Sequence, residues 1–141
     1  MADINSVAHV IQLAVAPVFL LTGVGAILSV LVNRLGRIVD RFRVLERTPP
    51  SPGLEAAHHE EMQALAHRER VIYWSISLCV LCALLICVVV AALFVSSVLN
   101  VELSALIASL FILAMMALIA GLVSFLREIQ IATGTMHRAV K

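Results

Sequence analysis

Asp, Glu, Lys, Arg and His are all absent from three long apolar runs of this sequence, at 11–32, 72–98 and 103–126. Only 13% of the 141 residues are charged and 62% are hydrophobic, whereas a soluble domain carries about 25% charged residues. Because a chain this short has too little interior to hide so much apolar surface from water, lipid is the expected solvent. The absence also argues against a proton or ion relay formed by this chain alone, since such relays place an ionisable group within the membrane.

Cysteine is scarce, and all three cysteines fall in the second apolar run, at Cys79, Cys82 and Cys87. Cys79 and Cys82 form a C-x-x-C pattern, but a helix in lipid offers no water for the thiolate that redox or metal chemistry needs. An odd number of cysteines also provides no disulfide framework. We therefore interpret them as small apolar side chains that fill space between helices.

No set of residues has the spacing of a catalytic or metal site. His59 and His67 lie two helical turns apart, so they do not converge on one ion as metal ligands do, and exposed surface is the simpler interpretation. Neither a Ser/His/Asp set nor a pair of acidic residues occurs at a spacing suited to catalysis. We expect neither a metal nor another cofactor, and we expect that the chain is not an enzyme.

Each apolar run is long enough to span a bilayer as a helix. The first run would make a helix about 35 Å long at ~1.5 Å per residue, against a hydrocarbon core of ~30 Å. Because backbone groups in lipid must be satisfied within the segment, continuous runs of this kind are helical. The predicted fold class is an all-α membrane protein, with three transmembrane helices and a cytoplasmic helical hairpin between the first and second. The predicted segments are a short external N-terminus (1–9), transmembrane helices at 10–32, 71–98 and 103–126, the hairpin at 33–70, an external turn at 99–102 and a cytoplasmic tail at 127–141.

The ten basic residues form two groups that indicate which side of the membrane each segment occupies. One group lies between the first and second apolar runs, and the other follows the third. Because basic residues are enriched in cytoplasmic segments, the hairpin and the tail are predicted to be cytoplasmic, and the N-terminus and the short turn external. Tyr73 and Trp74 follow Arg70 and fit the aromatic belt of the inner interface. The first group is Arg34, Arg37, Arg41, Arg43, Arg47, Arg68 and Arg70, and the second is Arg127, Arg138 and Lys141.

The segment between the first two apolar runs has the pattern of two helical arms joined by a proline turn. Residues 48–53, Thr-Pro-Pro-Ser-Pro-Gly, end the first arm because consecutive prolines cannot continue a helix. Each arm is predicted to continue without a break into its neighbouring transmembrane helix. Four apolar residues of the first arm recur at spacings of three and four, which is the pattern of a narrow helical seam: Leu35, Ile38, Phe42 and Leu45.

The first apolar run carries a stripe of polar and small residues that fall near one helical face. One interpretation is a pore lining, in which hydroxyl and amide groups replace part of an ion's water shell. The other is close helix packing, for which small residues four apart are typical. Pro17 is predicted to bend this helix because it removes one backbone hydrogen bond. The stripe consists of Gln12, Ala16, Thr22, Gly23, Ala26, Ser29 and Asn33, and the small pairs are Thr22 with Ala26, Gly25 with Ser29, and Ala117 with Gly121.

Charged residues gather where the first apolar run ends. Arg37 and Asp40 are three residues apart and can pair on a helix, as can Arg43 and Glu46. As exposed pairs they would each contribute less than ~1 kcal/mol and would also attract anionic lipid headgroups. The alternative is a ring of ion pairs at the cytoplasmic mouth of an assembly. The predicted boundary residues are Arg34, Arg37, Asp40 and Arg41.

Three segments together resemble a known family: Ala16–Ala26 (APVFLLTGVGA), Asn33–Arg41 (NRLGRIVDR) and Phe125–Ile129 (FLREI). In these segments the chain is similar to a family of small bacterial membrane proteins catalogued as domain of unknown function 2721. The resemblance covers nearly the whole chain. It implies a location in the bacterial inner (cytoplasmic) membrane and no established activity, so it assigns a role to no residue.

Two functional hypotheses follow from these patterns. The leading one is a homo-oligomeric pore or channel-like assembly with the first helix nearest the axis, and it is motivated by the polar stripe, Pro17 and the Asn33–Arg41 boundary. Because three helices can pack without leaving a cavity between them, any conduction path must form between subunits. The alternative is a non-conducting scaffold or accessory subunit, whose hairpin recruits an unidentified membrane or cytoplasmic partner through its apolar seam. The expected partners are the lipid bilayer and further copies of the chain, and a net charge of +1 gives no reason to expect nucleic acid.

Overall fold

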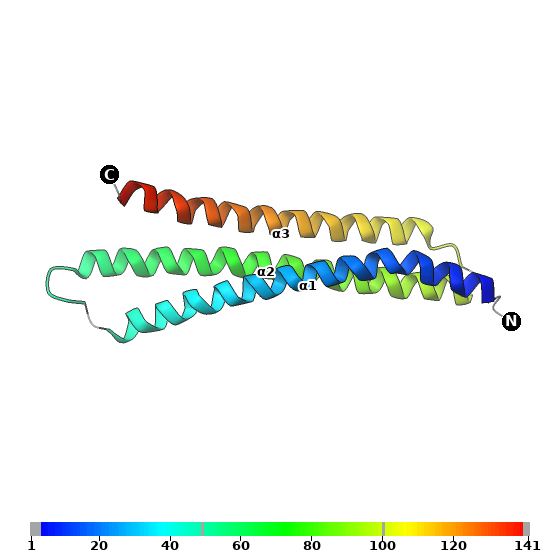
Figure 1. The fold of residues 1–141 in the computed structure, drawn as a ribbon, viewed down its shortest axis with the longest axis horizontal. Helices are drawn as coiled ribbons and strands as arrows, with labels where there is room; N and C mark the ends of the chain where they lie inside the picture. The colour runs from blue at the N-terminus through cyan, green and yellow to red at the C-terminus, as the bar shows by residue number, and fades with distance from the viewer. Residues whose placement is uncertain (1–3, 49, 100, 140–141) are drawn as a thin grey trace.

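The computed structural model describes residues 4–48, 50–99 and 101–139, with side chains for 7–48, 50–99 and 101–130. The chain forms three helices, α1 (Ile4–Arg47), α2 (Glu55–Leu99) and α3 (Ser104–Ala139) (Figure 1). All three are long and apolar enough to cross a membrane, which confirms the predicted all-α class with three candidate membrane-spanning helices. Residues 1–3 of the predicted N-terminus, Asn100 of the predicted turn and residues 140–141 of the predicted tail lie outside the described residues.

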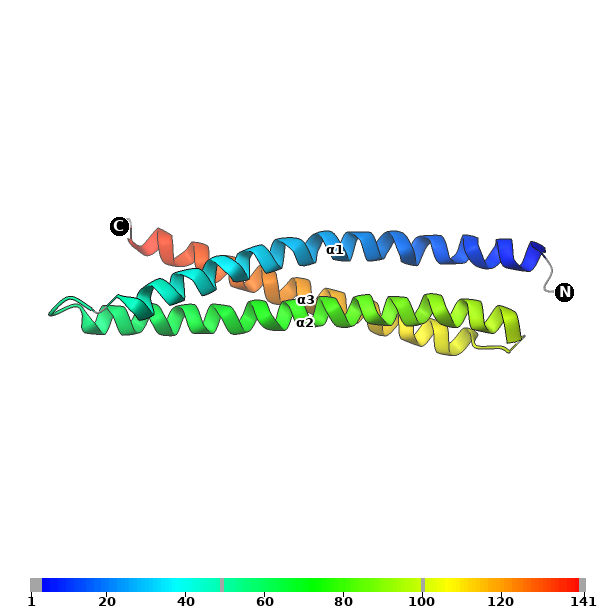
Figure 2. The same cartoon turned by 90° about the horizontal axis from the view of Figure 1, so that it is seen from below.

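The central helix of the unit is α2, which packs against both α1 and α3. No described residue of α1 brings its Cα atom within 8 Å of one in α3. The turn between α1 and α2 lies at the same end as the last turns of α3, and the start of α1 lies at the other end with the connection from α2 to α3 (Figures 1 and 2). The three helices therefore run side by side along one long axis.

Both α1 and α2 continue well beyond their apolar runs. They contain 44 and 45 residues, so each is about 66 Å long at ~1.5 Å per residue. The helix α1 passes through Pro17 without interruption. Beyond the apolar runs the two helices form a polar helical hairpin, closed by a turn in which Gly53 has a φ of 92°, a left-handed conformation that suits glycine.

The middle of the unit is filled by one apolar cluster drawn from all three helices. Cys79 and Cys82 are fully buried in it, where they occupy the positions of small apolar side chains, whereas Cys87 is exposed. The remaining members are between 0% and 8% exposed, which leaves no open path along the middle of the described unit. The cluster consists of Val24 and Leu31 from α1, Cys79, Cys82 and Ile86 from α2, and Ala114 and Ala117 from α3.

The helices α2 and α3 approach each other closely at Gly121. A Cβ atom at this position would lie 3.2 Å from Sγ of Cys79 and 3.3 Å from both Cβ of Leu78 and the backbone oxygen of Ser75. Ala117, one turn earlier, is 8% exposed. The small pair Ala117 and Gly121 thus lets the two helices pack closely within the chain.

Candidate functional site

The polar stripe of α1 lies on the face opposite the one that packs against α2. All seven residues of the stripe are exposed. The buried residues of α1, such as Ala14, Val24 and Leu31, alternate with them along the helix and form the packing face. Pro17 is buried on that packing face, away from the stripe. Packing within the chain therefore does not account for the stripe.

The glycines of α1 face open space. A Cβ atom at Gly23 or Gly25 would meet no other atom within 4 Å, in contrast to Gly121. The small pairs of α1 are exposed as well, whereas the small pair of α3 is already occupied by α2. The outer face of α1 is therefore shaped for the close approach of another helix, and no described residue of this chain fills it.

Three polar side chains of the stripe have no hydrogen-bond partner among the described residues: Gln12, Ser29 and Asn33. By contrast, the Thr22 hydroxyl donates to the backbone oxygen of Val18 at 3.4 Å. An amide or hydroxyl without a partner in an apolar medium costs about 1–3 kcal/mol. These groups therefore favour a neighbour that supplies water or polar atoms.

At the end of the apolar runs, Arg34 of α1 joins Glu128 of α3. The guanidinium Nη1 donates to Oε2 of Glu128 at 3.1 Å, and its carbon lies 5.3 Å from the centre of the Phe125 ring. The Arg34 side chain is 37% exposed and the Glu128 side chain is 5% exposed. Among the described residues, this pair is the one side-chain hydrogen bond between α1 and α3, whose Cα atoms stay more than 8 Å apart.

A second ion pair closes the hairpin. Arg41 donates to Oε1 of Glu61 on α2 from Nη2 at 2.9 Å and from Nε at 3.2 Å, and both side chains are largely exposed. Arg37 and Asp40, which the sequence places in pairing distance, form no ion pair with any described residue. The predicted pairing of Arg37 with Asp40 is therefore wrong: two exposed side chains on one helix gain too little to be held together, and the ion pairs that the structure shows join different helices.

The sequence alone did not identify Glu128 and Glu61 as ion-pair partners, because the arginines that bind them lie 94 and 20 residues away along the chain. A signal for Glu128 was nevertheless present. It is the first acidic residue after Glu102, and it stands two residues after the end of the third apolar run. A lone carboxylate at that depth needs a partner, which points to a cationic residue at the same level on another helix.

The apolar seam of the hairpin is turned inward. Leu45 is 9% exposed, and Leu65 on the second arm is equally buried. Leu35, Ile38 and Phe42 are half-buried. Most of the seam is therefore used within the hairpin itself, rather than left open for a partner.

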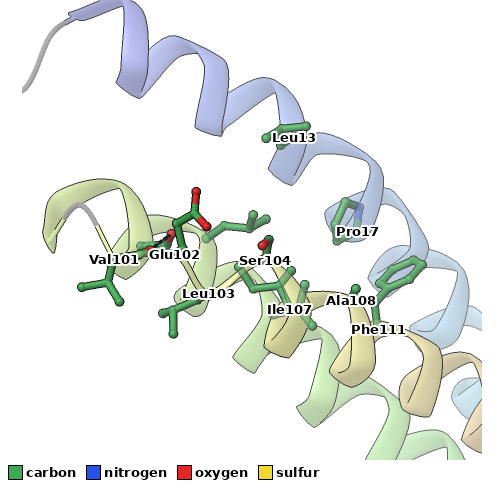
Figure 3. Close-up of a pocket in the computed structure, with 12 residues that line it drawn as sticks. Leu13, Pro17, Val101, Glu102, Leu103, Ser104, Ile107, Ala108 and Phe111 are labelled. Atoms are coloured by element: carbon green, nitrogen blue, oxygen red, sulfur yellow. Dashed lines mark hydrogen bonds between the residues drawn. The ribbon is translucent and has the colours of Figure 1, made fainter.

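At the other end of the unit, a hollow of about 760 Å³ separates α1 from the start of α3. Leu13 and Pro17 border it from α1, and Ile107 and Phe111 from α3 (Figure 3). Glu102, at its mouth, is the one charged residue in the lining. Such a lining suits an apolar chain and offers no paired groups for acid–base chemistry.

The model of a family described as a protein of unknown function, DUF2721, matches residues 14–138. The chain belongs to this family. The resemblance predicted from the three sequence segments is thereby confirmed, and the match includes the hairpin, the Arg34–Glu128 pair and most of the polar stripe. No curated protein and no solved structure matches the chain.

The DUF2721 match assigns no chemistry to these features. Within the described part of the chain, no group of three or more His, Cys, Asp or Glu side chains could hold a metal ion. The features that remain for a function are the exposed stripe on α1 and the charged groups at the hairpin end of the apolar runs.

Proposed function

We propose that this chain is a multi-pass membrane protein that assembles with further copies of itself into a channel-like structure, with α1 nearest the axis. The observation that carries the proposal is the polar stripe, which is exposed along α1 on the side away from α2. In a lone unit this side would face lipid. In a ring it faces other copies of α1 and the water between them.

Any conducting path would run between subunits. The middle of the three-helix unit is occupied by side chains such as Val24, Cys82 and Ile86, which are at most 1% exposed. The unpartnered groups of Gln12, Ser29 and Asn33 would line the shared space, where they could replace part of an ion's hydration shell. The small residues between them would allow neighbouring α1 helices to come close.

In this proposal the basic hairpin and the tail lie in the cytoplasm, the N-terminus lies outside, and the membrane is the bacterial inner membrane. The basis is the positive-inside rule together with the family resemblance. Asn33 and Arg34 then stand at the cytoplasmic mouth of the assembly. The Arg34–Glu128 pair ties α1 to α3 at that level and would hold α1 in place against the axis.

Cross-linking tests whether α1 helices of neighbouring copies lie next to each other. In a Cys87→Ser background, Asn33→Cys places a thiol on the stripe at the inner boundary, where water reaches it, and Leu126→Cys places a matched one on α3. Both sites are exposed and each directly precedes an arginine. With a thiol oxidant in native membranes, N33C should form disulfide-linked dimers and L126C should not. A monomeric particle in detergent together with no N33C dimer would rule out the assembly.

Flux through liposomes tests conduction separately. Wild-type protein should release small monovalent ions, and Ser29→Leu should lower the rate because it narrows and dries the lining. Ile112→Leu, on the outward face of α3, serves as the control, since Ile112 is 63% exposed and lies off the stripe. If N33C forms dimers but the liposomes release no ions, the result would favour the alternative, a non-conducting scaffold. The covered hairpin seam gives that alternative less support as a partner-recruiting surface.

A further inference from the structure

A second hollow, of about 280 Å³, lies between α2 and α3 at the inner end of the apolar runs. Its size is near the lower end of pockets that hold small ligands, roughly 300–1,000 Å³. Five of its six lining residues are polar or charged, in contrast to the mostly apolar residues around the hollow at the other end. It consists of His67, Arg68 and Val71 from α2, and Ser124, Arg127 and Glu128 from α3.

The charge of this hollow is not balanced within the described chain. Arg68 and Arg127 have no ion-pair or hydrogen-bond partner among the described residues, and neither has His67. The one acidic group in the lining, Glu128, is already held by Arg34 at 3.1 Å. Two arginines with unused donors therefore border a space whose one carboxylate is already paired with Arg34.

The hollow lies at the level of the lipid headgroups. Tyr73 and Trp74 follow the lining residue Val71 by less than one helical turn, and they are 63% and 61% exposed. Exposed Tyr and Trp next to a basic segment mark the interface between hydrocarbon and headgroups. Basic pockets between transmembrane helices at this depth bind the headgroups of anionic lipids.

We propose that the hollow between α2 and α3 binds the phosphate of an anionic phospholipid, with Arg68 and Arg127 as its ligands. Guanidinium groups hold phosphate oxygens through paired charge-assisted hydrogen bonds. The Ser124 hydroxyl donates to the backbone oxygen of Ala120 at 2.8 Å, so its oxygen can still accept a bond from a glycerol headgroup. The site does not depend on whether the assembly conducts.

Native mass spectrometry of the purified full-length protein can count bound lipids during titration. The probes are phosphatidylglycerol and phosphatidylcholine with identical chains, and phosphatidylglycerol should bind more tightly. Each arginine should contribute about fivefold to the affinity, so Arg68→Gln with Arg127→Gln should weaken phosphatidylglycerol binding about thirtyfold. The matched control, Arg43→Gln with Arg47→Gln, removes two exposed charges from the hairpin and should leave binding unchanged.

Three results would overturn the proposal. The first is equal binding of both lipids to the wild-type protein, a comparison that needs no variant to fold. The second is equal loss in the two double variants, which would indicate general charge attraction. The third is displacement of phosphatidylglycerol by excess inorganic phosphate, which would assign the site to the free anion. The charge-conserving pair Arg68→Lys with Arg127→Lys should bind phosphatidylglycerol more tightly than the glutamine pair but less tightly than the wild type, because lysine keeps the charge and loses the paired hydrogen bonds.

Discussion

Replacing Arg34 should destabilise the protein more than replacing Glu128, although the two form one pair. With Arg34→Gln, the Glu128 carboxylate stays buried, at 5% exposed, without its cation. Removing one partner of a buried pair costs about 3–5 kcal/mol, and the lower end applies here because Arg34 itself is 37% exposed. With Glu128→Gln, the guanidinium can still reach water and stays over Phe125, so the cost should be about 1–2 kcal/mol.

A double-mutant cycle measures this asymmetry. Unfolding in detergent can be followed by the fluorescence of Trp74, the single tryptophan of the chain. The double variant should be more stable than Arg34→Gln alone, with a coupling energy of about 2 kcal/mol. Arg43→Gln, at an exposed and unpaired site, is the control and should change stability by less than about 0.5 kcal/mol. If Arg34→Gln cost no more than Glu128→Gln, the inference from burial would be refuted.

Three further predictions concern packing, the hairpin and orientation. Gly121→Leu should lower the free energy of unfolding by about 1–3 kcal/mol, because the backbone of α2 blocks the new side chain. Gly25→Ala, at a site that faces open space, should instead raise it by about 0.5–1 kcal/mol. If thermal unfolding showed equal effects for the two variants, the packing described at Gly121 would be contradicted. The exposed Arg41–Glu61 pair should show a coupling energy below about 1 kcal/mol, and a larger value in the same unfolding assay would mean that the hairpin shields it from water. Ser51→Cys should react with an impermeant maleimide only after cells are permeabilised, and labelling in intact cells would reverse the proposed orientation.

The helices were predictable because lipid leaves the backbone few options. A run such as 103–126, with no charged residue, must satisfy its own hydrogen bonds, so a helix follows from length and composition alone. The continuity of α1 beyond Asn33 was predictable for a local reason as well, since no proline stands between Pro17 and the proline turn. In each case the information lies within one segment.

The ion pairs were not predictable because they depend on how the helices are arranged. Spacing along one helix selects Arg37 with Asp40, but the structure pairs Arg34 with Glu128 and Arg41 with Glu61. Which helices meet, and at which level, is set by the packing of all three, and the close approach at Gly121 is part of that packing.

The polar stripe was predictable from the sequence only in part. The sequence placed its residues on one face of the helix but left open whether that face packs or lines a pore. The structure excludes packing within the chain, because Val24 and Leu31 supply the packing face and the stripe points away from it. Packing against a helix outside this chain and pore lining remain, and the cross-linking and flux experiments distinguish them.

Because α1 continues without a break beyond its apolar run, any tilt of the apolar part also moves the first arm of the hairpin. The segment from Asn33 to Arg47 belongs to the same helix as the apolar run and extends about 22 Å at ~1.5 Å per residue. A tilt of about 10° would therefore shift its tip by roughly 4 Å, and helices tilt when the thickness of the bilayer changes. A change in bilayer thickness that tilts the apolar part of α1 would therefore also displace the charged arm, because no break in the helix separates the two.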